Sequence, residues 1–143
     1  MRVNWLAIVV STIVLFLFGW LWYDLLFGKM WMAEMAKLNP QFAAGMGSAG
    51  AYPFIVSLVM GFFTAYAVAR IIEWRGAWSL GRGALIGFSF GLLIFGSMTW
   101  MDYAYSGMGA TLGFINIGYV AIGMAIQGAI LGVWKPRAST SSA

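Results

Sequence analysis

The stretch FINIGYVAIGMAIQGAILGVW, residues 114–134, decides the fold of this chain because its 21 residues include no charged side chain. At about 1.5 Å per residue, a helix of this length covers roughly 30 Å, the thickness of the hydrocarbon core of a bilayer. In lipid the backbone polar groups must bond within the segment. The stretch is therefore predicted to be a transmembrane α-helix.

Three further stretches have the same character. The four predicted spans cover about 3–23, 52–72, 84–101 and 112–134, and no charge interrupts the middle of any of them. The first span is expected to be retained, because it ends in the bulky WLWYDLLF without a small-residue cleavage site. The sequence thus predicts an all-α integral membrane protein, a compact bundle of four transmembrane helices forming one domain over residues 1–134.

The composition agrees and limits the chemistry. Of 143 residues, 62% are hydrophobic and 8% are charged, against about 25% charged in an ordinary soluble domain. Cysteine and histidine are absent, which removes thiol chemistry, the commonest general base and the commonest metal ligand. The net charge of +4 is scattered at segment ends. We therefore expect no catalytic residue, no metal, no cofactor and no nucleic-acid partner.

The basic residues predict an orientation. With four spans, the two termini and the second loop share one side, which carries Arg2, Arg70, Arg75, Arg82, Lys135 and Arg137. The opposite side carries only Lys29 and Lys37. Basic loops stay in the cytoplasm, so both termini are predicted to be cytoplasmic. The tail, residues 135–143, has little to bury and is predicted to be disordered.

The first outer loop, residues 24–51, is the one long loop that the four spans predict. Its first half places Met30 and Trp31 near one face of a short helix, which we expect to lie in the membrane interface. Docking of a partner on the methionine-rich face is the alternative. Asn39 and Pro40 would end this helix, and AAGMGSAGA, residues 43–51, is predicted to be a flexible return.

Small residues form stripes on two spans. Such stripes favour close helix contacts in lipid. The third and fourth spans are therefore expected to pack together, although either could pack against a second copy. The stripe residues are Gly83, Gly87 and Gly91 on the third span, and Gly118, Ala121, Ala125, Gly128 and Gly132 on the fourth.

Polar side chains within the spans allow two interpretations. They are either a seam that a small solute follows or interhelical hydrogen bonds, worth about 0.6 kcal/mol each. We favour hydrogen bonding because no buried charge marks a water-filled path. The residues are Asn4, Ser11, Asn116, Tyr119 and Gln127.

Two acids follow aromatic bands at span ends. WLWYD at residues 20–24 ends on Asp24, and WMDY at residues 100–103 contains Asp102. The aromatic residues are expected at the lipid headgroups. The acids could form an outer cation site or simply mark the water boundary. The candidate outer-surface site comprises Trp22, Tyr23, Asp24, Lys29, Trp31 and Asp102.

Three motifs together resemble a bacterial family of small membrane proteins, the domain of unknown function numbered 1761 (DUF1761). They are NWLAIVV at 4–10, GWLWYDLLFGKMWM at 19–32, and the stretch at 114–134. The resemblance implies a four-helix membrane protein and, with the orientation above, a place in the bacterial inner membrane. It supplies no reaction or substrate. It draws attention to the motif residues Asn4, Trp22, Tyr23, Lys29, Trp31, Asn116 and Tyr119.

The functional expectation follows from these features. The missing catalytic groups and the small-residue stripes favour a non-enzymatic protein that acts through helix packing, as a homo-oligomer or as an accessory subunit of a membrane complex. Its partners would be the lipid bilayer and either itself or another membrane protein. A small transporter or channel for a small solute or cation is the alternative.

Overall fold

The computed structural model describes residues 3–136, apart from the side chains at positions 43, 44 and 47. The helices are α1 (Trp5–Trp20), α2 (Gly28–Leu38), α3 (Phe42–Ser48), α4 (Tyr52–Arg75), α5 (Leu80–Ser89), α6 (Ser97–Ser106) and α7 (Ala110–Val133). Two π-helical segments, η1 (Leu21–Leu26) and η2 (Phe90–Gly96), continue α1 and join α5 to α6. The predicted tail falls mostly on residues 137–143, which lie outside the described part.

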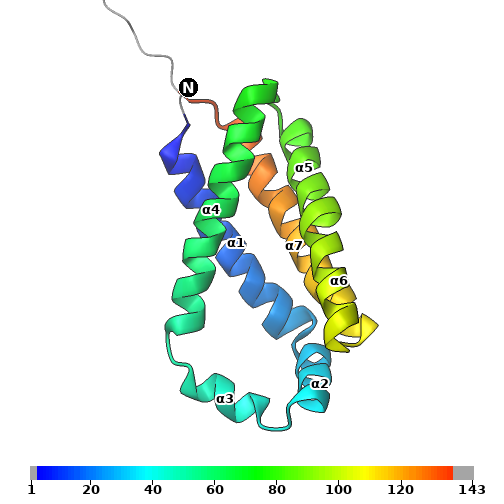
Figure 1. Ribbon diagram of the computed structural model, residues 1–143. Helices are drawn as coiled ribbons and strands as arrows, with labels where there is room; N and C mark the ends of the chain where they lie inside the picture. The colour runs from blue at the N-terminus through cyan, green and yellow to red at the C-terminus, as the bar shows by residue number, and fades with distance from the viewer. Residues whose placement is uncertain (1–2, 137–143) are drawn as a thin grey trace, which may run out of the picture.

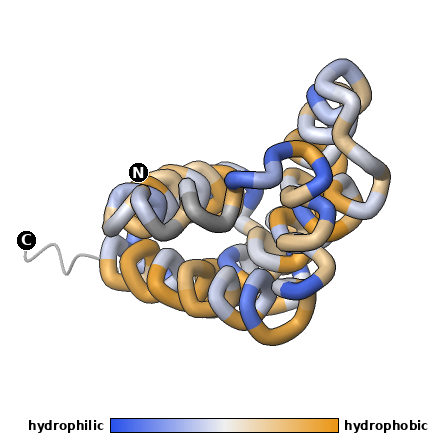
Figure 2. Tube along the Cα trace, turned by 90° about the horizontal axis from the view of Figure 1, so that it is seen from below, coloured by the Kyte–Doolittle hydropathy of each residue, from blue (hydrophilic) through white to orange (hydrophobic). Residues whose placement is uncertain are grey.

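Four continuous helical stretches are long and apolar enough to cross a membrane: Trp5–Leu26, Tyr52–Arg75, Leu80–Ser106 and Ala110–Val133. They lie side by side, with the first and last described residues, 3 and 136, at one end of the bundle (Figure 1). The hydrophobic colours of Figure 2 run along these long helices. The predicted four-helix membrane fold is confirmed.

The third span is longer than its apolar residues predict. It begins at Leu80 instead of near residue 84 and ends at Ser106 instead of near residue 101. Outside the hydrocarbon core a helix can continue through polar residues, and it commonly ends at a glycine in the left-handed backbone conformation. Gly76 (φ 59°) and Gly107 (φ 69°) occupy such positions after α4 and α6. The two connections are therefore shorter than predicted.

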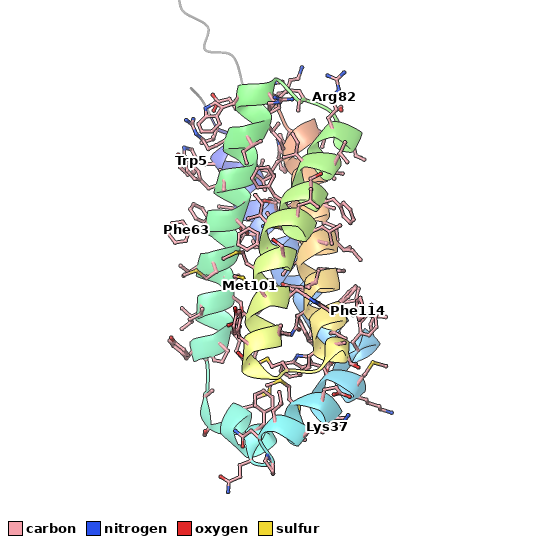
Figure 3. All side chains as sticks on the ribbon, turned by 45° about the vertical axis from the view of Figure 1, so that its right-hand side comes forward. Trp5, Lys37, Phe63, Arg82, Met101 and Phe114 are labelled. Atoms are coloured by element: carbon pink, nitrogen blue, oxygen red, sulfur yellow. The ribbon has the colours of Figure 1, made fainter. Side chains whose placement is uncertain are left out.

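The buried centre lies where α1, α4 and α7 meet, towards the end that carries the termini. Ile8, Val68 and Ile72 are fully buried there, and Met124 packs with them. Figure 1 shows α1 and α4 meeting near this end and diverging towards the other. We call these the termini end and the α2–α3 end. Arg82 lies at the first and Lys37 at the second, while Phe63 and Phe114 project outward (Figure 3).

The long connection at the α2–α3 end is more helical than predicted. The expected short helix is present as α2, and no residue of α2 is fully buried. The segment predicted as a flexible return instead forms α3 and a short turn before α4. The ring of Trp31 packs edge-on against that of Phe42, with ring centroids 5.4 Å apart. This contact holds the first residue of α3 against α2.

The small-residue stripes bring α5 and η2 against α7 along nearly their whole length. A Cβ added at Gly83 would overlap the backbone oxygen of Gly128, and one at Gly87 would overlap that of Met124. A Cβ at Gly91 would lie 2.8 Å from the Cα of Ala121. The predicted packing of the third and fourth spans is confirmed. The glycine stripe of the third span contacts α7 of the same chain.

One member of the predicted stripe serves a different contact. Gly118 faces Trp22, and a Cβ there would lie 3.0 Å from the indole ring. Gly118 precedes Gly128 by ten residues on α7, at the level of η1, whereas Gly128 and Gly132 face Gly83 and Ser79 of the third span. Gly118 thus packs against the first span and not against the third.

Candidate functional site

The motif residues of the first span meet those of the fourth span at the α2–α3 end. The indole N–H of Trp22 donates to the backbone oxygen of Ile115 at 3.0 Å. The hydroxyl of Tyr23 donates to Oδ1 of Asn116 at 2.7 Å. The ring of Tyr119 lies 5.0 Å from that of Tyr23. We call Trp22, Tyr23, Trp31, Tyr103, Asn116 and Tyr119 the aromatic–asparagine cluster.

The π-helical turn η1 explains how the adjacent residues Trp22 and Tyr23 both reach α7. The backbone N–H of Phe27 bonds to the carbonyl of Trp22 at 2.9 Å, a five-residue step in place of four. Such widened turns recur at functional sites. Gly28 is needed at the end of the turn, because a Cβ there would lie 2.7 Å from the backbone oxygen of Tyr23.

Asn116 is the polar centre of the cluster. Its Oδ1 accepts from Tyr23, and its Nδ2 donates to the hydroxyl oxygen of Tyr103 at 2.6 Å. One amide therefore connects the first, third and fourth spans. In the sequence Tyr103 belongs to the WMDY stretch, whose aromatic residues are expected at the lipid headgroups, and its contact with Asn116 was not predicted. The spacing within either span carries no signal for this contact, because it depends on how the third span lies against the fourth.

The structure separates the candidate outer-surface site into two groups. Trp22 is buried, because its indole packs into the space left by Gly118. Tyr23 and Trp31 are half-buried with ring centroids 5.5 Å apart. Asp24, Lys29 and Asp102 are exposed, and none of them bonds to another described residue. The described chain also contains no group of three or more acids placed to hold a metal ion.

The predicted polar seam is distributed over separate contacts. Asn4 caps α1 by accepting from the N–H of Ala7 at 3.2 Å, and Ser11 donates to the carbonyl of Ile8 at 2.9 Å. The hydroxyl of Tyr119 lies 3.4 Å from the carbonyl of Leu15. These bonds stay local or join neighbouring helices.

Gln127, like Ser11, is fully buried. Its Nε2 donates to the carbonyl of Gly61 at 3.0 Å, and its Oε1 lies 3.1 Å from the hydroxyl of Thr64. Both partners belong to α4. Gln127 therefore joins the second and fourth spans by interhelical hydrogen bonds.

The family model described as "Protein of unknown function (DUF1761)" matches residues 6–132. The chain belongs to the DUF1761 family. No curated protein and no solved structure matches it. The family match includes the aromatic–asparagine cluster and begins two residues after Asn4, so the helix cap lies just outside it.

Proposed function

We propose that this DUF1761 protein is non-enzymatic and acts through contacts between membrane helices, as a homo-oligomer or as an accessory subunit of a membrane complex. The observation that carries the proposal is the hydrogen bonding of the buried polar side chains. Among the described residues, every buried side-chain nitrogen and oxygen has a hydrogen-bond partner. A catalytic or solute-conducting interior needs polar groups that remain available to a ligand. The surface is therefore the better candidate for the functional part.

One lipid-facing surface is suited to a partner helix. Where α1 and α4 diverge, their side chains border an apolar groove of about 330 Å³. Its walls include Val9 and Ile13 of α1 and Leu58 and Phe62 of α4, near the middle of both spans. Helix association in lipid comes from van der Waals packing. A ridge of side chains from a partner helix would gain contacts in this groove that a smooth helix face does not offer.

The alternative is a small transporter or channel with Asp24 and Asp102 at its mouth. The separate bonding of Asn116 and Gln127 gives this alternative less support, because each side chain already has its partners. Flux into liposomes that contain the purified protein tests it. Flux that falls in a variant carrying Asp24→Asn and Asp102→Asn would favour transport over the packing proposal.

Extraction in several mild detergents followed by native mass spectrometry tests the packing proposal. We expect a mass of two or more copies, or of one copy with another membrane protein. A chain that appears alone in every detergent would contradict the proposal. The groove variant Leu58→Trp adds a control, because it fills the groove without altering the α5–α7 contact, and we expect it to reduce the larger mass.

A further inference from the structure

A second, smaller cavity lies at the α2–α3 end, between the end of α6 and the start of α7. Its volume is about 190 Å³. Trp100 and Tyr103 of α6 line it, together with Met108 and Gly109 of the turn and Gly113 of α7. Sites for drug-sized ligands occupy roughly 300–1,000 Å³. This cavity therefore suits a small head group more than a large molecule.

The aromatic walls of the cavity are held in place by the rest of the fold. Gly113 leaves room for the indole of Trp100, because a Cβ there would lie 2.7 Å from the ring. The oxygen of Tyr103 accepts from Asn116 at 2.6 Å, and Asn116 is held by Tyr23. A site whose walls are fixed before binding loses less entropy when a ligand enters.

The charges around the cavity favour a cation. No lysine or arginine lines it. The carboxylate of Glu34 lies at its edge, with Oε2 3.7 Å from the point where a Cβ on Gly109 would be. The other oxygen of Glu34 pairs with the ammonium group of Lys37 at 2.6 Å, and water screens the charge of Lys37 more, because its side chain is 67% exposed and that of Glu34 is 19% exposed. Aromatic faces attract ammonium groups, and a nearby carboxylate adds to that attraction.

We propose that this cavity binds an alkylammonium group, with Trp100 and Tyr103 as its aromatic walls and Glu34 as the nearby counter-charge. The group has two possible sources. One is the head group of an aminophospholipid such as phosphatidylethanolamine, since span ends lie at headgroup depth. The other is a free amine in the surrounding water. The binding chemistry is the same for both, and the inference does not depend on the proposed oligomer.

The indole N–H resonance of Trp100 reports on the site directly. Full-length ¹⁵N-labelled protein in a maltoside detergent is titrated with short-chain phosphatidylethanolamine, with phosphatidylglycerol of the same chains, and with free ethanolamine. Loss of one indole signal in Trp100→Phe assigns the resonance. We expect a saturable shift with phosphatidylethanolamine and none with phosphatidylglycerol. A saturable shift with ethanolamine as well would identify the free amine as a sufficient ligand.

Two variants with the same change of charge make the test specific. Glu34→Gln is expected to weaken binding of the amine about threefold to tenfold, the range of a contact with a partly exposed cation. Asp24→Asn removes an exposed acid outside the cavity and should leave binding unchanged. Equal shifts with both phospholipids, no saturable shift with either amine, or equal effects of the two variants would overturn the proposal.

Discussion

Tyr23 and Asn116, 93 positions apart in the chain, form a hydrogen bond of 2.7 Å between the first and fourth spans. Because Asn116 also donates to Tyr103, the side chain of one residue fixes three spans at the α2–α3 end. Its two interhelical bonds are both between side chains, and each joins α7 to a different span. Asn116 therefore has an unusually large share in holding this end of the bundle together.

Replacement of Asn116 by leucine should destabilise the bundle. Two interhelical bonds at about 0.6 kcal/mol each predict a loss of roughly 1 kcal/mol in the free energy of unfolding. The measurement is unfolding of the protein in bicelles by added sodium dodecyl sulfate, with the helix content followed by circular dichroism. Tyr105→Phe is the control, because Tyr105 is 91% exposed and bonds to no other described residue. Equal stability of Asn116→Leu and the control would refute the structural role of the amide.

Gly87→Ala should disturb the contact between α5 and α7. The added methyl group would meet the backbone of Met124, which cannot rotate away as a side chain can. Overpacking of this kind costs about 1–3 kcal/mol. Gly81→Ala is the matched control on the same helix, since a Cβ there meets nothing within 4 Å. Thermal unfolding in detergent should show a clear drop for Gly87→Ala alone, and similar curves for both variants would show that the helices are not so close.

The bond between Thr64 and Gln127 can be measured by a double-mutant cycle. Thr64→Val and Gln127→Leu should show a coupling energy of about 0.6 kcal/mol in the free energy of unfolding. Ser57→Ala replaces Thr64→Val in the control cycle. Ser57 bonds to the carbonyl of Pro53 in its own helix, so its coupling with Gln127 should be near zero. A Thr64 coupling no larger than that of Ser57 would contradict the interhelical bond.

The predicted orientation is open to a simple labelling experiment, because the chain has no cysteine of its own. Tyr105→Cys adds a thiol at the α2–α3 end, and Gly81→Cys adds one near the termini end. With both termini in the cytoplasm, a membrane-impermeant maleimide should label Tyr105→Cys in intact cells. It should label Gly81→Cys only after the membrane is opened. The reverse pattern would place the termini outside.

The sequence was sufficient for the features that depend on hydropathy and on small residues. The four spans were predictable because uncharged stretches of this length have few alternatives to a helix in lipid. The α5–α7 contact was predictable because Gly83 and Gly87 recur at a four-residue step, which places them on one helix face. The same regular spacing gave no warning that Gly118 faces Trp22.

Other features depend on local backbone geometry that composition does not reveal. A span that is apolar all round has the same hydropathy with α- or π-helical turns, so η1 and the inward turn of Trp22 were not predicted. The small residues of α3 indicated flexibility, yet the contact between Trp31 and Phe42 supports a helix there. The meeting of Tyr103 with Asn116 depends on how the third span lies against the fourth, which spacing within either span does not specify.

Site-specific photo-cross-linking in native membranes tests the central claim, that this protein acts through a helix docked in the groove between α1 and α4. Benzoylphenylalanine replaces Phe63, whose side chain lines the groove and is 59% exposed. Leu93 of η2, which is 68% exposed and remote in the fold, carries the same group in the control. The account predicts a discrete protein adduct from position 63, with a second copy or another membrane protein, and only lipid adducts from position 93. Lipid adducts alone from both positions would contradict it.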